Sequence, residues 1–129
     1  MIRPLILSCL LLMGYGLHAQ TDLATAWADS VYNTMTETER LGQLFMIRAH
    51  SDLGPEHIQS VETQIKKYKV GGLCFFQGTP ERQVELINQY QKLAEPVPLM
   101  MAIDGEWGLG MRMKSSTISF PRQLTLGAI

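Results

Sequence analysis

A short segment in the second half of the chain carries the residues best suited to binding or catalysis. Asp104 comes directly after the apolar run Leu99–Ile103, and Glu106, Trp107 and Arg112 follow it closely. An ionised carboxylate can accept hydrogen bonds from two hydroxyls of a polyol such as a sugar. An aspartate at this place can equally well cap a turn or the next helix. Residue type and position alone leave both interpretations of Asp104 open.

Each neighbour of Asp104 has a functional and a structural interpretation. In an extended chain, the Cα atoms of Asp104 and Glu106 would lie about 6.6 Å apart on one face, as a pair of glycosidase carboxylates might. The glycine-rich stretch 105–110 indicates a turning loop instead, so we do not expect such a pair. Trp107 could stack on a sugar ring, but a lid over the core explains it better. Arg112 could pair with Asp104 or Glu106 and support the loop, or it could be solvated.

Other candidate sites are weaker. His50 and His57 have no cysteine or carboxylate at metal-ligand spacing, and His57 is expected to be exposed near a helix start, so we predict no metal site. Gly108 and Gly110 lack the third glycine of a dinucleotide-binding loop. The sequence also contains no Gly-x-Ser-x-Gly, phosphate-binding loop or His-Glu-x-x-His motif. We therefore expect neither a metal nor a cofactor.

The elements that would position Asp104 are strands separated by helices. Apolar runs without polar alternation begin near Phe45, Leu73 and Leu99, as in strands buried on both faces of a parallel sheet. The order βαβαβ predicts an α/β fold. Ligands of such folds bind beyond the carboxyl ends of the strands, where Asp104 stands. The strand spacing fits a (β/α)₈ barrel and also a doubly wound sheet, and it does not decide between them.

Helical spacing predicts which side chains are buried. Asp22 is expected to cap a helix with an apolar stripe, and Thr36 with Glu39 forms a capping box for the next helix, which continues through Phe45. Proline in the first turn marks two further helices, after Gly54 and from Thr79. Cys74, inside an apolar run, is expected to be a small core residue. The predicted stripes are Trp27, Val31 and Met35; Ile58, Val61, Ile65 and Tyr68; and Val84, Ile87, Tyr90 and Leu93.

The N-terminal segment and the composition bear on location and partners. Residues 1–19 show the pattern of a signal peptide: Arg3, the short apolar run Leu5–Leu12, and Ala19 as the last residue removed. We therefore expect export to the periplasm or outside the cell, and favour this over a lipoprotein at Cys9 or a transmembrane segment. The 129 residues carry 11 basic against 12 acidic side chains, which argues against nucleic-acid binding.

Four segments, in order, resemble the N-terminal barrel domain of glycoside hydrolase family 3. They are Leu41-Gly42-Gln43-Leu44, Val70-Gly71-Gly72-Leu73, Pro98 to Arg112, and Phe120-Pro121 with Leu126-Gly127-Ala128. The family's run Asp-x-Glu-Gly-Gly-x-Val-x-Arg corresponds to residues 104–112. Asp104, Glu106, Gly108 and Arg112 match it. Trp107 replaces a glycine and Gly110 a valine, which puts the path of the loop in question.

The resemblance implies residues 20–129 to be the first part of a (β/α)₈ barrel domain, about three βα units, of an exported glycosidase. The implied activity is release of a terminal β-linked N-acetylhexosamine with retention, because the Asp-x-Glu form is similar to that branch. The alternatives are a β-glucosidase-type enzyme and a non-catalytic sugar-binding remnant. Asp104 is implied to bind sugar hydroxyls, with Glu106, Trp107 and Arg112 as loop supports. The nucleophile and the acid are expected beyond Ile129, so neither is assigned here.

Overall fold

The computed structural model describes residues 23–129, and the chain divides after Thr36 into two compact units. In the first unit, residues 23–34 form the predicted helix. Trp27, expected on its apolar face, is 55% exposed, whereas Met35, directly after the helix, is buried. The predicted signal peptide, residues 1–19, and the predicted cap Asp22 lie outside the described residues.

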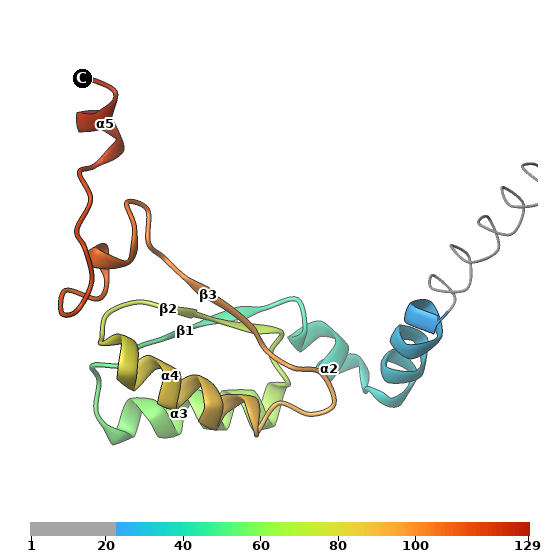
Figure 1. Cartoon of the computed structure of the whole chain (residues 1–129). Helices are drawn as coiled ribbons and strands as arrows, with labels where there is room; N and C mark the ends of the chain where they lie inside the picture. The colour runs from blue at the N-terminus through green and yellow to red at the C-terminus, as the bar shows by residue number, and fades with distance from the viewer. Residues whose placement is uncertain (1–22) are drawn as a thin grey trace, which may run out of the picture. The chain divides into compact units, whose positions relative to one another are not determined.

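The second unit is a mixed α/β structure built on a small parallel sheet (Figure 1). Its elements are α2 (Glu37–Gly42), β1 (Met46–Ala49), α3 (Pro55–Tyr68), β2 (Gly72–Phe75), α4 (Pro80–Gln91), β3 (Met100–Ile103), the 3₁₀ turn η1 (Leu109–Met111) and α5 (Gln123–Leu126). The strands lie in the order β1-β2-β3, and Ala49, Phe75 and Ile103 are in register. The predicted α/β class and the three strands are confirmed.

Helices α3 and α4 pack on the same face of this sheet (Figure 1). Each helix connects one strand to its parallel neighbour, and consecutive strands lie side by side. A (β/α)₈ barrel repeats this arrangement around a circle, and one half of a doubly wound sheet also contains it. The described sheet is common to both architectures.

The core lies between the sheet and the two helices. Phe75 of β2 is fully buried, and its ring centroid is 6.5 Å from that of Tyr90 of α4. Side chains from the sheet and from both helices have less than 2% of their surface exposed. Each such large apolar side chain contributes about 1.5–3 kcal/mol by leaving water. They are Val61, Ile65, Leu73, Phe75, Leu86 and Tyr90.

The predicted helix faces are correct for the centre of α3 and partly wrong for α4. Val61 and Ile65 are buried as expected, but Tyr68 is 42% exposed. In α4, Val84 is exposed and Leu86 takes the predicted core position instead. The buried face of α4 therefore passes through Gln83, a polar residue that hides the apolar periodicity from a sequence-based prediction.

Two glycines fix the corner where the chain enters β1 and β2. A Cβ on Gly42 would lie 1.8 Å from the carbonyl oxygen of Tyr68, and one on Gly71 would lie 2.1 Å from that of Gln43. The backbones after α2 and after α3 are thus in direct contact, which only glycine permits. Helix α2 ends at Gly42, so the expected continuation through Phe45 is wrong, and Leu44 is 80% exposed.

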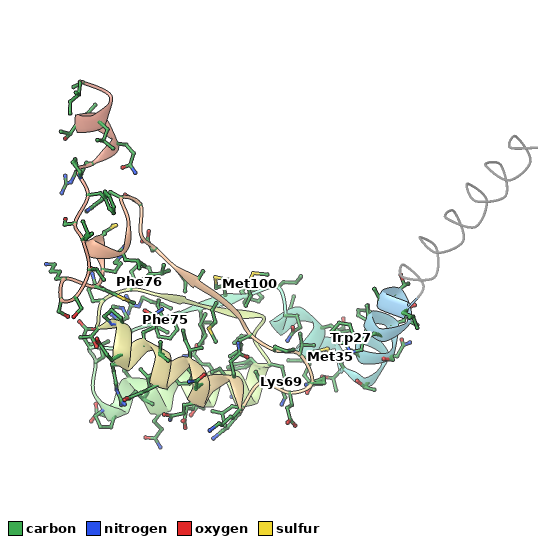
Figure 2. The ribbon with its side chains drawn as sticks, viewed as in Figure 1. Trp27, Met35, Lys69, Phe75, Phe76 and Met100 are labelled. Carbon is green, nitrogen blue, oxygen red and sulfur yellow. The ribbon has the colours of Figure 1, made fainter. Side chains whose placement is uncertain are left out.

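No described element of the second unit covers the sheet face opposite α3 and α4. Met46 of β1 and Met100 of β3 are 43% and 68% exposed on this face, and Figure 2 shows Met100 on the side away from the helices. Alternation along β2 places Cys74 on the same face, opposite to Phe75. Cys74 is a free, partly exposed thiol, so its prediction as a core residue is wrong.

Candidate functional site

The residues that directly follow the three strands meet at one edge of the sheet. His50 follows β1, Phe76 follows β2 and Asp104 follows β3. The ladder continues to these positions, because the Phe76 N–H donates to the Ala49 carbonyl at 2.9 Å and the Asp104 N–H to the Phe75 carbonyl at 3.1 Å. Alternation sends the side chains of Phe76 and Asp104 away from α3 and α4, whereas the ring of His50 meets His57 in the first turn of α3. We call these residues, together with Arg112, the carboxyl-edge cluster.

Arg112 holds Asp104 by two hydrogen bonds. Its Nε donates to the backbone carbonyl of Asp104 at 2.6 Å, and its Nη2 donates to the carboxylate oxygen Oδ2. The side chain of Arg112 is 13% exposed and that of Asp104 is 34% exposed. Of the two carboxylates considered as partners for Arg112, the structure brings Asp104 to it. The second oxygen, Oδ1, has no hydrogen-bond partner among the described residues.

Aromatic and cationic groups stack beside this pair. The guanidinium carbon of Arg112 is 4.6 Å from the centroid of the Phe76 ring. The imidazole of His50 is stacked on the same ring, with 5.6 Å between centroids and 15° between planes. Because β2 lies between β1 and β3, Phe76 stands between His50 and the Arg112–Asp104 pair. The sequence analysis did not assign Phe76 to the site; its place directly after an apolar strand was the only available signal.

The two histidines contact each other instead of standing apart. The His50 backbone N–H donates to Nε2 of His57 at 3.1 Å, and the rings meet edge to face at 5.5 Å between centroids. His57 is therefore half-buried in the first turn of α3, and its predicted exposure is wrong. Burial lowers the pKa of His57, and the charges of His50 and Arg48 lower it further, against the opposing effect of Asp52.

One ring nitrogen of His50 has a polar partner and the other has none among the described residues. Its Nδ1 lies 3.4 Å from a carboxylate oxygen of Asp52, while its Nε2 is buried without a hydrogen-bond partner in the described part of the chain. Within residues 23–129, no group of three or more histidine, cysteine or carboxylate side chains is arranged to hold a metal ion. The two histidines contact each other, and His50 also stacks on Phe76.

The loop after Asp104 turns sharply. Gly108 donates its N–H to the Gly105 carbonyl at 3.0 Å and has φ of 98°, which favours glycine. Trp107 adopts no positive φ, so it replaces a glycine here without backbone strain. Its ring is half-buried and faces the guanidinium of Arg122, 4.9 Å from centroid to Cζ. Trp107 is not packed on the core cluster, so its interpretation as a core lid is wrong.

Glu106 and Gly110 also take defined places in this loop. The Glu106 side chain is exposed, and its backbone carbonyl accepts a hydrogen bond from the side chain of Gln123. A Cβ on Gly110 would lie 2.7 Å from the carbonyl oxygen of Ile118 and 2.8 Å from Cα of Ser119. The loop therefore follows a path in which residues 118–119 cross directly over Gly110, and a valine would not fit there.

A cavity of about 340 Å³ opens beside Arg112. This volume is at the lower end of the range typical of small-molecule sites. Most of its lining residues carry hydroxyl, amide or charged groups, but the surface that they present to the cavity is mostly apolar. The lining residues are Asp52, Gln77, Gly78, Thr79, Arg112, Lys114 and Ser115.

Comparison with known proteins adds one finding. Residues 36–129 match the family model described as the glycosyl hydrolase family 3 N terminal domain. No curated protein matches the chain. None of the helices in the described range 23–129 is long and apolar enough to cross a membrane.

Proposed function

Because the chain belongs to glycosyl hydrolase family 3, we propose that its carboxyl-edge cluster binds the terminal sugar of a glycoside through Asp104. Membership of this family implies that the activity is hydrolysis of glycosidic bonds and that the substrate is a carbohydrate. The observation that carries the assignment to Asp104 is its place directly after β3, with one carboxylate oxygen bonded by Arg112 and the other unbonded by any described residue.

The Arg112 contact sharpens how Asp104 would bind a sugar. Since Oδ2 already accepts from Nη2 of Arg112, Oδ1 is the oxygen that would receive sugar hydroxyls. The pairing also fixes the carboxylate before a ligand arrives, which reduces the entropy lost on binding. The cavity that Arg112 lines is where we place the rest of the ligand.

The finer proposal is a retaining enzyme that releases terminal β-linked N-acetylhexosamine and is exported to the periplasm or the medium. It is supported by the sequence Asp104-Gly105-Glu106, which resembles the hexosaminidase branch, and by the signal-peptide pattern of residues 1–19. Retaining glycosidases use two carboxyl groups about 5–5.5 Å apart. We assign neither role to Asp104, which Arg112 holds, nor to Glu106, which is exposed on the turn.

Calorimetric titration of the purified chain tests the proposal. N-acetylglucosamine is expected to bind saturably and more tightly than glucose, whereas a β-glucosidase-type site would prefer glucose. Asp104→Ala is expected to abolish binding, and Glu81→Gln, on an exposed helix turn, is the control that keeps it. Circular dichroism verifies that both variants are folded.

Turnover is measured on the same samples with a nitrophenyl N-acetyl-β-glucosaminide. Since no catalytic carboxylate is assigned within these residues, we expect binding without release of nitrophenol. Saturable binding that Asp104→Ala leaves unchanged would contradict the assignment of Asp104. Release of nitrophenol by the purified chain would show that the catalytic groups are present in it and would overturn that part of the proposal.

A further inference from the structure

We propose that Phe76 is a positioning residue of the sugar site, with His50 as the group that supports its ring. The proposal rests on the proposed role of Asp104 in sugar binding. Phe76 touches Arg112 rather than the carboxylate, so it would act by fixing the guanidinium that holds Asp104.

The two hydrogen bonds from Arg112 leave one motion unrestrained. Nε and Nη2 both donate toward Asp104, so they align one edge of the planar guanidinium with its partner. They do not prevent the plane from tilting about that edge. The Phe76 ring, 4.6 Å from the guanidinium carbon, blocks the tilt on one face and attracts the cation.

The place of Phe76 in the fold argues against a core role. Phe75 is fully buried against Tyr90, whereas Phe76 is only partly buried and does not belong to the core cluster. Consecutive strand residues point to opposite faces, so Phe76 faces away from α3 and α4. Its described ring contacts are His50 and Arg112, which are both members of the carboxyl-edge cluster.

His50 holds the Phe76 ring from the β1 side. The imidazole lies nearly parallel to that ring, at 15°, and is fixed by its own contacts: Asp52 at Nδ1 and the edge-on ring of His57. A continuous series of contacts therefore runs from the first turn of α3 through His50 and Phe76 to Arg112. Its effect would be to keep Oδ1 of Asp104 directed to the ligand.

The test replaces the ring and then restores it. Phe76→Leu removes the aromatic face, and Phe76→Met fills a similar volume with a flexible chain, so the test does not depend on one variant. Phe76→Tyr keeps the face. Loss of one such cation–ring contact predicts about two- to fivefold weaker binding of N-acetylglucosamine in the first two variants. Wild-type affinity is expected in Phe76→Tyr.

A second readout follows Arg112 itself. Nuclear magnetic resonance measures solvent exchange of the Arg112 Nε–H, which is protected by its bond to the Asp104 carbonyl. Exchange is expected to accelerate at least several-fold in Phe76→Leu and Phe76→Met and to stay slow in Phe76→Tyr. The matched control is Tyr68→Leu, which removes another ring under a cation, Lys67 at 5.0 Å, on the exposed end of α3. It should change neither readout.

The two readouts separate this proposal from the proposed function. If wild type binds no sugar, the role of Asp104 fails, and the exchange rates still decide whether Phe76 fixes Arg112. Unchanged exchange and unchanged affinity in both Phe76→Leu and Phe76→Met would overturn the positioning role. Faster exchange with unchanged affinity would overturn the link between Arg112 and the sugar.

Discussion

Replacing Arg112 by methionine probes the contact on which the site depends. The change keeps an unbranched apolar stem of similar length, so packing beside Phe76 is largely conserved. It removes the two hydrogen bonds to Asp104 and the cation above the Phe76 ring. The carboxylate of Asp104 then lacks the partner that now bonds Oδ2.

The magnitude follows from the exposure of the two partners. Hydrogen bonds that involve a charged group contribute about 1.5–3 kcal/mol when buried. Arg112 is 13% exposed, but Asp104 is 34% exposed, so solvent screening reduces the share of the carboxylate bond. The cation–ring contact adds about 0.5–1 kcal/mol. We therefore expect Arg112→Met to lower the free energy of unfolding by about 2–3 kcal/mol.

Urea unfolding followed by circular dichroism measures this loss. With a slope of about 1 kcal/mol per molar for a domain of this size, the midpoint should fall by about 2 M or more. Arg82→Met is the matched control, because Arg82 pairs with Glu85 at 2.7 Å while both side chains are about half exposed. That pair should contribute only about 0.3–0.5 kcal/mol. Equal losses in the two variants would refute the argument from burial.

Three further changes test other features of the structure. Burial raises the pKa of Tyr90 to about 12, and its hydroxyl has no partner among the described residues. Tyr90→Phe should therefore leave the free energy of unfolding unchanged or raise it by about 1 kcal/mol. In urea titrations, wild type should lose stability as pH rises from about 10 toward 12, and Tyr90→Phe should not show this loss. The pKa of His57 is lowered in the folded chain, so its contribution to the free energy of unfolding is full above about pH 6.5 and is lost as pH falls through the folded-state pKa. In this pH range, the urea unfolding midpoint of His57→Gln should depend less on pH than that of wild type. Gly110→Val, which restores the residue usual in the family, should cost about 1–3 kcal/mol in thermal unfolding because its side chain meets the backbone of residues 118–119.

Each of these predictions has an outcome that contradicts it. A loss above 1 kcal/mol in Tyr90→Phe would mean that the hydroxyl is bonded in solution. Parallel pH curves for wild type and His57→Gln would show that His57 titrates alike in the folded and unfolded chain. Unchanged stability of Gly110→Val would show that the loop follows another path over this glycine.

The strands and the position of Asp104 could be predicted because they depend on local sequence. Continuous apolar runs bounded by prolines and glycines marked β1, β2 and β3 to within one or two residues, and the residue after a strand is known once the strand is. The end of α3 was predicted less well. The helix stops at Tyr68, where Lys69 takes a left-handed conformation with φ of 50°, ahead of Gly71 and Gly72. The Lys69 carbonyl accepts from the side chain of Gln43, a contact between distant segments.

The burial of single side chains could not be predicted where the buried face of a helix contains a polar residue or where a face of the sheet has no helix packed on it. Val84 is exposed and Leu86 buried because α4 rests on the sheet through a face that includes the polar Gln83. Cys74 lies in an apolar strand, yet the described helices of the second unit cover only the other face of the sheet. Trp107 faces Arg122 from the far end of the chain, a partner that no local pattern indicates.

By itself, the sequence determined the α/β class, the order of the elements and the place of Asp104 at a strand end, since these follow from the hydrophobic period and the turn residues of short segments. Tertiary structure alone decided that Arg112 bonds Asp104 rather than Glu106, and that Phe76 and His50 stand beside that pair. It also explains the glycines, because Gly42 and Gly71 lie against backbone from a segment far away in the sequence, and Gly110 lies against residues 118–119. The physical difference is the distance along the chain over which the two kinds of information extend. A hydrophobic period of two or 3.6 residues is a property of a single strand or helix. A contact across parallel strands exists only after the strands have come into register.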